Sequence, residues 1–304
     1  EDIKESLEFS NKQPLIIIVD TGSGEENLIS LKKIKMYKSK VVIIDHHKPA
    51  ILDENPDKAV VDDFVDVHVN PHLVGGDSNL TAGMLSVEIA RLINKNNDVT
   101  IFLAALSGVG DKSKGKIFDE YLKLTKLDSE HLKKLALCLD FEAQYIRYIE
   151  SDIINDLLFY KQKEIMDIIL PEIEKSIKET EKVVKKYVHA EKIENKEKNS
   201  TFLKLELNLE KIRFDDFPNS SKVVAVTHRM YNEPRVTLGI GNDFVIVRAD
   251  DVTFELNKLV KQMKKKMLHA HISGGGHDCA GTIKFIEAAK DEVIDYIEKY
   301  LRKL

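Results

Sequence analysis

The sequence contains no tryptophan, only two cysteines and no long hydrophobic run. Cys138 and Cys279 are too few and too far apart to predict a disulfide framework or a zinc site. The apolar runs, such as residues 15–19, have the length of a strand and fall far short of the roughly 18 residues of a membrane span. No secretory signal is recognisable. We therefore expect a cytoplasmic location and no membrane partner.

The chain also lacks an excess of positive charge. Its 304 residues carry a formal net charge of −5, which argues against a protein that wraps nucleic acid by bulk charge but leaves room for a local basic groove. Hydrophobic residues make up 43% and charged residues 32%, as in a globular protein with a sizeable core. The length allows about two domains.

The first 110 residues alternate between apolar runs and amphipathic segments. Residues 15–19 and 41–44 predict strands, the first of them covered on both faces, and the apolar run 101–106 predicts another strand. Residues 25–37 and 81–94 predict the helices between them. Strands that alternate with helices are typical of an α/β fold with a parallel sheet, whose chemistry lies beyond the carboxyl ends of the strands.

The second half of the chain predicts a helical stretch followed by a smaller α+β unit. Residues 129–187 repeat apolar side chains at spacings of three and four, and Pro171 is expected to kink or restart this helix. The polar segment 191–200 predicts a loop or linker. Beyond it we expect strands at residues 202–207, 223–226, 236–240, 244–247 and 282–286, and helices at residues 253–267 and at the C-terminus.

Acidic and imidazole side chains follow the predicted strands. Asp20 ends the first strand, Asp45 and His46 end the second, and Asp111 follows the run 101–106. One such aspartate alone is more often a cap or turn former, but three strand ends would converge on one rim of a parallel sheet. An oxygen-rich set with one imidazole and no thiolate suits Mn²⁺ or Mg²⁺ better than a structural zinc. Two such ions would polarise a phosphoryl oxygen and activate water.

A glycine run near the C-terminus is the second chemical signal. Gly274, Gly275 and Gly276 let backbone N–H groups approach an anion closely, and His277 adds a charge-assisted donor for a phosphate oxygen. The alternative is a glycine-rich turn into the last strand. Arg248 is a further candidate for a phosphate contact.

These motifs resemble the DHH phosphoesterase superfamily. The resemblance rests on Asp20 in VDTGSG, Asp45-His46-His47 in IIDHHKP, Asp111 in GVGDKS and the late GGGH, which occur in family order over nearly the whole chain. The chain looks most similar to the archaeal RecJ-like single-strand exonucleases of the GINS-associated type.

The resemblance implies a role for each motif residue. Asp20 would bridge two Mn²⁺ or Mg²⁺ ions, and His46 and Asp111 would complete the shell of one ion. Asp45 would orient and polarise His46 from behind, as is common for metal-bound imidazoles. His47 would face the substrate phosphate.

The resemblance also implies a domain plan and an activity. Residues 1–135 would form the DHH domain, residues 136–200 a helical connector, and residues 201–304 the DHH-associated domain that presents residues 274–277 to the substrate. The activity would be metal-dependent hydrolysis of phosphodiester bonds in single-stranded DNA or RNA, in DNA repair or replication. Two alternatives stay open: a non-catalytic RecJ-derived replication factor that binds GINS and DNA, and a phosphodiesterase of short oligonucleotides or cyclic dinucleotides.

One departure from the family concerns its first motif. The family opens with a strand that carries a His-x-Asp-x-Asp motif, whereas residues 1–19 contain no histidine and only one aspartate, Asp2. As given, the chain cannot assemble the full two-metal site. We expect that a segment bearing the motif lies upstream, because the later motifs are intact; a degenerate relative is the alternative.

Overall fold

The computed structural model describes residues 14–52, 55–95, 100–145, 151–195, 198–212 and 217–304. Asp2 therefore lies outside the described residues. The chain divides into two compact units, residues 1–137 (unit 1) and residues 138–304 (unit 2). Both units mix helices and strands, and the predicted α/β class with a parallel sheet is confirmed. No described helix combines the length and the apolar character that a bilayer crossing requires.

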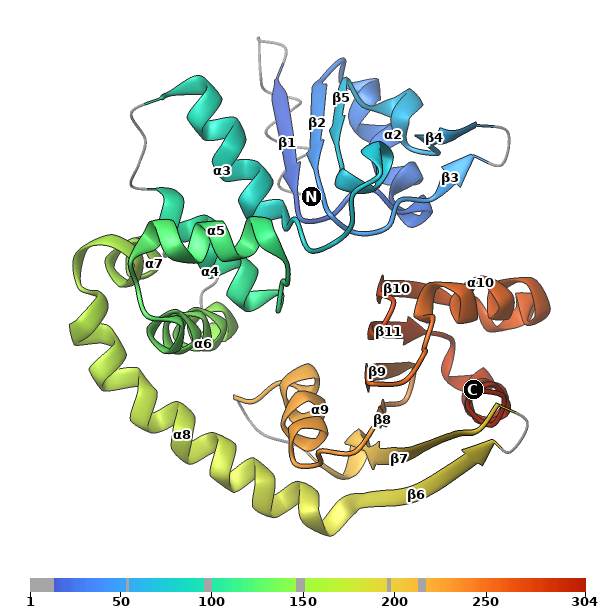
Figure 1. Ribbon diagram of the computed structural model, residues 1–304. Coiled ribbons are helices and arrows are strands. Elements are labelled where there is room, and N and C mark those ends of the chain that lie inside the picture. Colours follow the sequence, from blue (N-terminus) through green and yellow to red (C-terminus); the bar gives the residue numbers. More distant parts are fainter. Residues whose placement is uncertain (1–13, 53–54, 96–99, 146–150, 196–197, 213–216) are drawn as a thin grey trace. The chain divides into compact units, whose positions relative to one another are not determined.

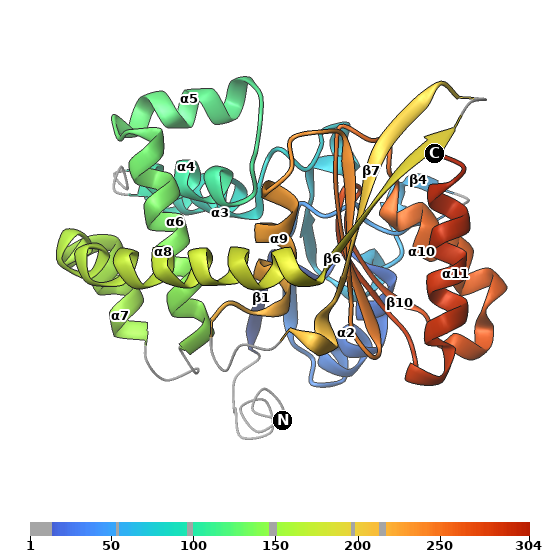
Figure 2. The ribbon, with the colours of Figure 1, turned by 90° about the horizontal axis from the view of Figure 1, so that it is seen from below.

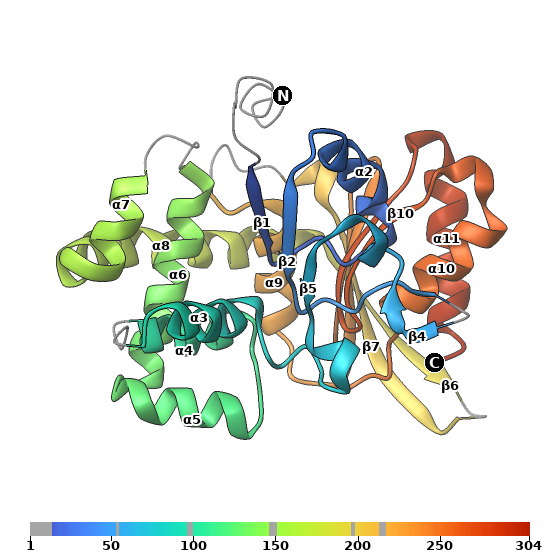
Figure 3. The same ribbon diagram turned by 90° about the horizontal axis from the view of Figure 1, so that it is seen from above.

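Unit 1 is built on three parallel strands in the order β1-β2-β5, which lie side by side in Figures 1 and 3. Their bounds are β1 (Leu15–Val19), β2 (Lys40–Ile44) and β5 (Val67–Val69). The register pairs Val19 with Ile44, and Ile44 with Val69. All three strands therefore end at the same edge of the sheet. A separate two-stranded sheet contains β3 (Ile51–Leu52) and β4 (Asn55–Ala59).

One face of this sheet is covered by α2 (Leu28–Met36), and Leu31 and Ile43 are buried between them. On β1, however, the side chains of Leu15 and Ile17 are 61% and 55% exposed. The prediction that this strand is covered on both faces is wrong within the described residues. The reason is its position, because β1 lies at the edge of the three-stranded order and α2 covers only one face.

Helices form the remainder of unit 1. Their bounds are α3 (Ala82–Ile93), α4 (Ile101–Gly110), α5 (Lys116–Thr125) and α6 (Ser129–Tyr145), the last of which continues into unit 2. Three short 3₁₀ helices are η1 (Glu25–Asn27), η2 (Asp62–Phe64) and η3 (Pro71–Val74). The helix predicted at residues 81–94 is confirmed, and Thr81 caps it by accepting a hydrogen bond from the Met84 N–H.

The strand predicted at residues 101–106 is wrong, because this run forms the first turns of α4. A short apolar run fits a buried helix as well as a buried strand. Gly108 lies so close to the Phe118 ring that an added Cβ would be 2.4 Å from it. Such close approach suits two packed helices, α4 and α5.

Unit 2 contains a six-stranded sheet in the order β10-β11-β9-β8-β7-β6. All neighbouring pairs are antiparallel except β7 and β8. The strands are β6 (Val188–Asn195), β7 (Ser200–Asn208), β8 (Arg235–Ile240), β9 (Phe244–Asp250), β10 (Ser273–His277) and β11 (Ala280–Lys284). The helices are α7 (Ser151–Asn155), the π-helical η5 (Asp156–Tyr160), α8 (Gln162–Tyr187), α9 (Ser220–Arg229), α10 (Leu256–Lys266) and α11 (Lys290–Leu301), with 3₁₀ helices η6 (Leu209–Lys211), η7 (Leu268–Ala270) and η8 (Glu287–Ala289).

Helices cover both faces of this sheet. Figure 2 shows α9 on one face and α10 and α11 on the other. Side chains alternate accordingly along β9, where Val245 and Val247 join the core with α10 and α11, whereas Ile246 joins the core with α9. The sheet is thus buried on both sides in its centre.

Of the two outcomes expected at Pro171, a restart of the helix does not occur, because α8 continues through this residue. Two further predictions for unit 2 are wrong in detail. Most of the supposed linker 191–200 belongs to the hairpin of β6 and β7, whose charged residues point to solvent on an edge strand. Residues 223–226 lie in α9, which is capped by the Asn219 side chain.

Candidate functional site

Polar residues follow each strand of the unit 1 sheet at its carboxyl edge. Asp20, Asp45 and Asn70 come directly after β1, β2 and β5, and two backbone hydrogen bonds extend the ladder by one step. The Asp20 N–H donates to the Ile44 carbonyl (2.9 Å), and the Asp45 N–H donates to the Val69 carbonyl (3.0 Å). The predicted placement of Asp20 and Asp45 at neighbouring strand ends is confirmed. Asp20 has a φ of +64°, a conformation that aspartate tolerates better than most residues.

Asp111 reaches this edge by a different route from the predicted one. It follows the helix α4, and its N–H donates to the Ser107 carbonyl (3.0 Å). Its carboxylate nevertheless lies 3.8 Å from the Nε2 atom of His46, and the carboxylate of Asp20 lies 3.2 Å from the same atom. The structure therefore places Asp20, His46 and Asp111 together, as the sequence predicted, although the third residue comes from a helix.

The ring of His46 is held from its other side. The side chain is 1% exposed, and Nδ1 lies 2.9 Å from the carbonyl oxygen of Ser78. A ring that donates from Nδ1 to a carbonyl directs Nε2 toward the two carboxylates. Burial lowers the pKa of His46, but hydrogen bonds to Asp20 and Ser78 and the charge of Asp111 outweigh it, so the pKa lies above its usual value.

This arrangement fits a divalent cation. The carboxylates that favour a proton on Nε2 of His46 would also favour a metal ion there, and oxygen ligands with one imidazole suit Mn²⁺ or Mg²⁺. A second grouping lies beside it, since ligand atoms of Asp20, Asp45 and His47 are all within 4.8 Å of one another. Asp20 belongs to both groupings, and in the second one Asp45 and His47 are hydrogen-bonded to each other.

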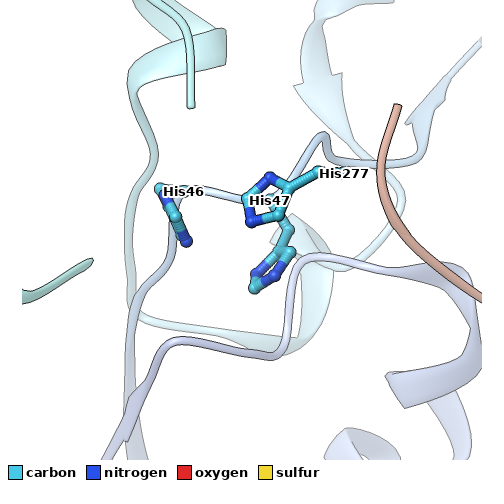
Figure 4. Close-up of side chains that lie close together, drawn as sticks. All are labelled: His46, His47 and His277. Atoms are coloured by element: carbon cyan, nitrogen blue, oxygen red, sulfur yellow. The ribbon is translucent and has the colours of Figure 1, made fainter. Parts of the chain in front are cut away.

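The structure corrects the role expected for Asp45. Its Oδ1 atom lies 2.8 Å from Nδ1 of His47 and accepts the backbone N–H groups of His46 (2.8 Å) and His47 (3.1 Å). Asp45 therefore orients the ring of His47, whereas the carbonyl of Ser78 orients His46. The two imidazole rings lie edge to face, with centroids 4.8 Å apart (Figure 4).

The hydrogen bonds around Asp45 fix its charge. Its other oxygen, Oδ2, accepts the backbone N–H of Ser23 (3.0 Å). Burial raises the pKa of Asp45, but the donors of His47 and Ser23 outweigh burial and hold the pKa well below its usual value. In turn, the hydrogen bond to Asp45 raises the pKa of His47, with burial opposing. The pair is therefore an aspartate that stays ionised and an imidazole that favours its cationic form.

Several residues of this network were not predicted from the sequence. The Ser23 hydroxyl lies 2.8 Å from Nε2 of His68, whose Nδ1 lies 2.6 Å from Asp62. Asn70 donates to the Ser23 hydroxyl (3.0 Å) and to the His47 carbonyl (2.9 Å). Asn70 lies in the segment VNPHL, a signal that could have identified it, whereas His68 and Asp62 belong to no motif.

The glycine run of unit 2 is a strand and not a loop. Residues 273–277 form β10 and pair with β11, so the glycine-rich turn considered as an alternative is wrong. An added Cβ would lie 2.1 Å from the Thr282 carbonyl at Gly274 and 2.4 Å from the Ala280 carbonyl at Gly276. At Gly275 it would meet only the Asn257 side chain, at 3.0 Å. The close pairing of β10 with β11 therefore explains why Gly274 and Gly276 are glycines.

Arg248 lies on β9, beside the same strand pair. Its Nε atom is buried without a hydrogen-bond partner among the described residues. Burial and then the neighbouring guanidinium of Arg229 lower the pKa of Arg248. A buried guanidinium group with an unused donor is well suited to bind an anion.

The chain shares this architecture with a solved DHH domain. It is 35% identical to the DHH domain of PF0399, a member of a family of ribosomal proteins, with a TM-score of 0.89 over 99% of this chain and 72% of that one. The chain belongs to the DHH superfamily. No family model matches it.

Two further comparisons extend this assignment. The DHH chain is 37% identical to the uncharacterized protein MJ1198 of Methanocaldococcus jannaschii over 96% of its length, but it spans only 42% of that relative. RecJ of Thermus thermophilus, solved in complex with Mn²⁺, is 15% identical with a TM-score of 0.59, over 99% of this chain and 46% of that one. This last likeness concerns the fold alone.

Proposed function

We propose that this DHH protein hydrolyses phosphodiester bonds in single-stranded DNA or RNA with Mn²⁺ or Mg²⁺, two ions in the intact site. One observation carries the proposal: Nε2 of His46 lies between the carboxylates of Asp20 and Asp111 at the carboxyl edge of a parallel sheet. When bound, the ions would supply Lewis-acid polarisation of the phosphoryl group and activation of water. The RecJ structure with Mn²⁺ shares the fold and supports the same choice of cation.

The side chains of unit 1 divide the work. Asp20, His46 and Asp111 would hold the cations, and the Ser78 carbonyl keeps the His46 ring in the ligating orientation. His47, anchored by Asp45, which raises its pKa, would donate a hydrogen bond to a phosphate oxygen. This hydrogen bond would stabilise the negative charge that develops on the phosphoryl oxygens in the transition state. Asp45 is thus a positioning residue for His47.

Unit 2 would contribute substrate contacts. We propose that Arg248 binds a backbone phosphate, because its buried Nε has no partner among the described residues. The substrate would be approached by the segment Gly274, Gly275, Gly276 and His277. Strand pairing excludes a side chain at Gly274 and Gly276 but not at Gly275, so the glycine at this position is the one left for a substrate contact. The finer proposal is a RecJ-like exonuclease of DNA replication or repair, cytoplasmic, with the GINS complex as a candidate partner.

The test compares Asp20→Asn with Asp119→Asn in the full-length protein. Asp119 is an exposed carboxylate on α5 and serves as the matched control. Loss of a ligand worth several kcal/mol should reduce Mn²⁺-dependent cleavage of an end-labelled 30-nucleotide strand about a thousandfold. Titration calorimetry should show weaker Mn²⁺ binding for Asp20→Asn alone. Wild-type cleavage by that variant would overturn the proposal.

A further inference from the structure

Unit 1 has a pocket next to the candidate site that none of the proposed roles uses. It has a volume of about 350 Å³ and lies between the segment 71–80 and the segment 114–118. This volume is within the range of small-molecule sites, roughly 300–1,000 Å³. Both segments are also tied to the cation ligands, so an occupant of the pocket would lie close to the reacting group.

The apolar part of the pocket comes from both segments. Pro71 and Leu80 line it from one segment, and Ile117 and Phe118 from the other. Ile117 lies in the first turn of α5, and its side chain is 53% exposed and accessible to a ligand. Phe118 is fixed by its tight packing on Gly108. Rigid apolar surfaces of this kind suit a flat ring.

The polar wall of the pocket is preorganised. The Asn79 side chain accepts the Lys114 N–H (2.9 Å) and donates to Asp77 (3.1 Å), while Asp77 accepts the Asn79 N–H (2.8 Å). These bonds hold an amide and a carboxylate in place at the lip of the pocket. Amide and carboxylate groups can hydrogen-bond to the edges of unstacked bases.

Positive charge surrounds the entrance. Lys114 and Lys116 line the pocket and are exposed, and Lys112 lies two residues before Lys114 in the sequence DKSKGK. The described partner of Lys116 is Glu120, at 4.0 Å across an exposed pair that contributes little. An apolar pocket with a lysine rim fits a ligand that joins an aromatic ring to a phosphate.

The pocket is connected to the candidate site on both sides. Ser78, whose carbonyl holds the His46 ring, stands between the two polar wall residues Asp77 and Asn79. On the other side, Lys114 follows three residues after Asp111, and its N–H is fixed by Asn79. An occupant would therefore lie near the group that orients His46 and near a cation ligand.

We propose that this pocket binds a nucleobase of the substrate strand, with Lys114 and Lys116 on the adjoining phosphates. The inference rests on the proposed function and specifies how the strand is held in unit 1. Base contacts of this kind tolerate different sequences, because each base offers a flat face.

The experiment measures binding without cleavage, in EDTA, with two fluorescent probes. One is a five-nucleotide DNA strand, and the other has the same phosphates with abasic sugars. Because stacking of one base contributes about 1–3 kcal/mol, the wild type should bind the base-containing strand about tenfold or more tightly than the abasic one. Equal affinity for the two probes, or no binding of either, would overturn the proposal.

Variants then locate the base contact. Ile117→Asp should lower affinity for the base-containing strand to the abasic level, and its exposed position should leave the melting temperature unchanged. The double variant Lys114→Ala/Lys116→Ala should weaken both probes equally and reduce the salt dependence. Lys123→Ala, an exposed lysine on the same helix but outside the pocket, is the control. Undiminished discrimination by Ile117→Asp would contradict the pocket assignment.

Failure of the pocket and failure of the proposed function remain distinguishable. If Ile117→Asp removes base-dependent binding but the wild type shows no Mn²⁺-dependent cleavage, the pocket proposal stands and the nuclease proposal is rejected. If the protein cleaves with Mn²⁺ and neither Ile117→Asp nor removal of the bases changes that cleavage, the nuclease proposal stands and the pocket proposal is rejected.

Discussion

Unit 1 and unit 2 both bury charged side chains but compensate the charge in opposite ways. In unit 2, the Lys204 side chain is 5% exposed and lies 2.6 Å from the Glu298 carboxylate and 2.9 Å from that of Glu191. Arg235 similarly donates to Asp250 (2.9 Å). Lys204 thus ties β7 to β6 and α11, and Arg235 ties β8 to β9.

In unit 1, carboxylates outnumber imidazoles. Asp20, Asp45 and Asp111 lie around His46 and His47 at one edge of a small sheet. Negative charge in such a partly buried cluster is costly unless a cation compensates it. Paired buried charge therefore serves the architecture of unit 2, whereas in unit 1 the partly exposed carboxylates of Asp20 and Asp111 gather beside the buried Asp45 and His46 and mark a site. Substitutions in the two units should therefore affect different measurements.

The largest effect is expected for Asp45→Asn. Without the carboxylate that anchors Nδ1 of His47, turnover should fall about a thousandfold, or roughly 4 kcal/mol in activation free energy. Mn²⁺ affinity should stay within a few-fold of wild type, because Ser78 and not Asp45 holds the His46 ring. Steady-state cleavage and calorimetry measure the two quantities. A parallel loss of Mn²⁺ affinity would show that Asp45 acts through His46 after all.

Lys204→Met should produce the reverse pattern in unit 2. Removing the cation leaves the carboxylates of Glu191, Glu206 and Glu298 close together without a positive partner. The free energy of unfolding should therefore fall by about 2 kcal/mol, which is less than the loss on breaking a fully buried ion pair. Urea denaturation followed by circular dichroism measures this loss, and turnover should be unchanged. Lys192→Met, at an exposed pair on the neighbouring strand, is the control and should cost under about 0.5 kcal/mol.

The pH dependence of this effect has a definite sign. Burial lowers the pKa of Lys204, but hydrogen bonds to Glu298 and Glu191 outweigh burial, so its folded pKa lies above the usual value. The stabilisation is therefore complete below the usual lysine pKa of about 10.4 and is lost as pH rises through the folded pKa. Asp45, with its pKa held low, should instead lose its contribution as pH falls below about 4. The hydrogen bond to Lys204 also lowers the pKa of Glu191, so the same interaction is lost at acid pH as the carboxylates become protonated. The difference in stability between wild type and Lys204→Met should therefore be largest near neutral pH and should shrink at both extremes.

The sequence predicted which residues end the strands better than it predicted the hydrogen-bond partners of those residues. Asp20 and Asp45 could be placed because β-branched runs before them define two parallel strands. Which imidazole Asp45 orients could not be predicted, since both histidines follow it and the choice depends on Ser78, which lies 32 residues beyond His46. Adjacency in sequence does not determine ring orientation.

Short apolar runs led to wrong predictions of secondary structure. Residues 101–106 and 223–226 look like buried strands, yet both lie in helices. Periodicity cannot separate the two cases over four to six residues. A capping signal was present for the second, because Asn219 precedes it and accepts the N–H of Lys222.

The smallest effect is expected for His68→Gln, which tests how far the site of unit 1 extends. His68 bridges Asp62 to the Ser23 hydroxyl, and Ser23 donates its N–H to Asp45. Losing this support should loosen the Asp45 carboxylate and lower turnover about tenfold, or roughly 1.4 kcal/mol.

A double-mutant cycle separates this positioning role from a general loss of stability. If His68 acts through Asp45, then His68→Gln should have almost no further effect on turnover in the Asp45→Asn background, because the ring of His47 has already lost its anchor. A purely structural role would lower turnover by the same factor in both backgrounds. Additive effects would confine the site to the residues that surround His46 and His47, and would make Asp62 and His68 part of the supporting architecture, as Lys204 is in unit 2.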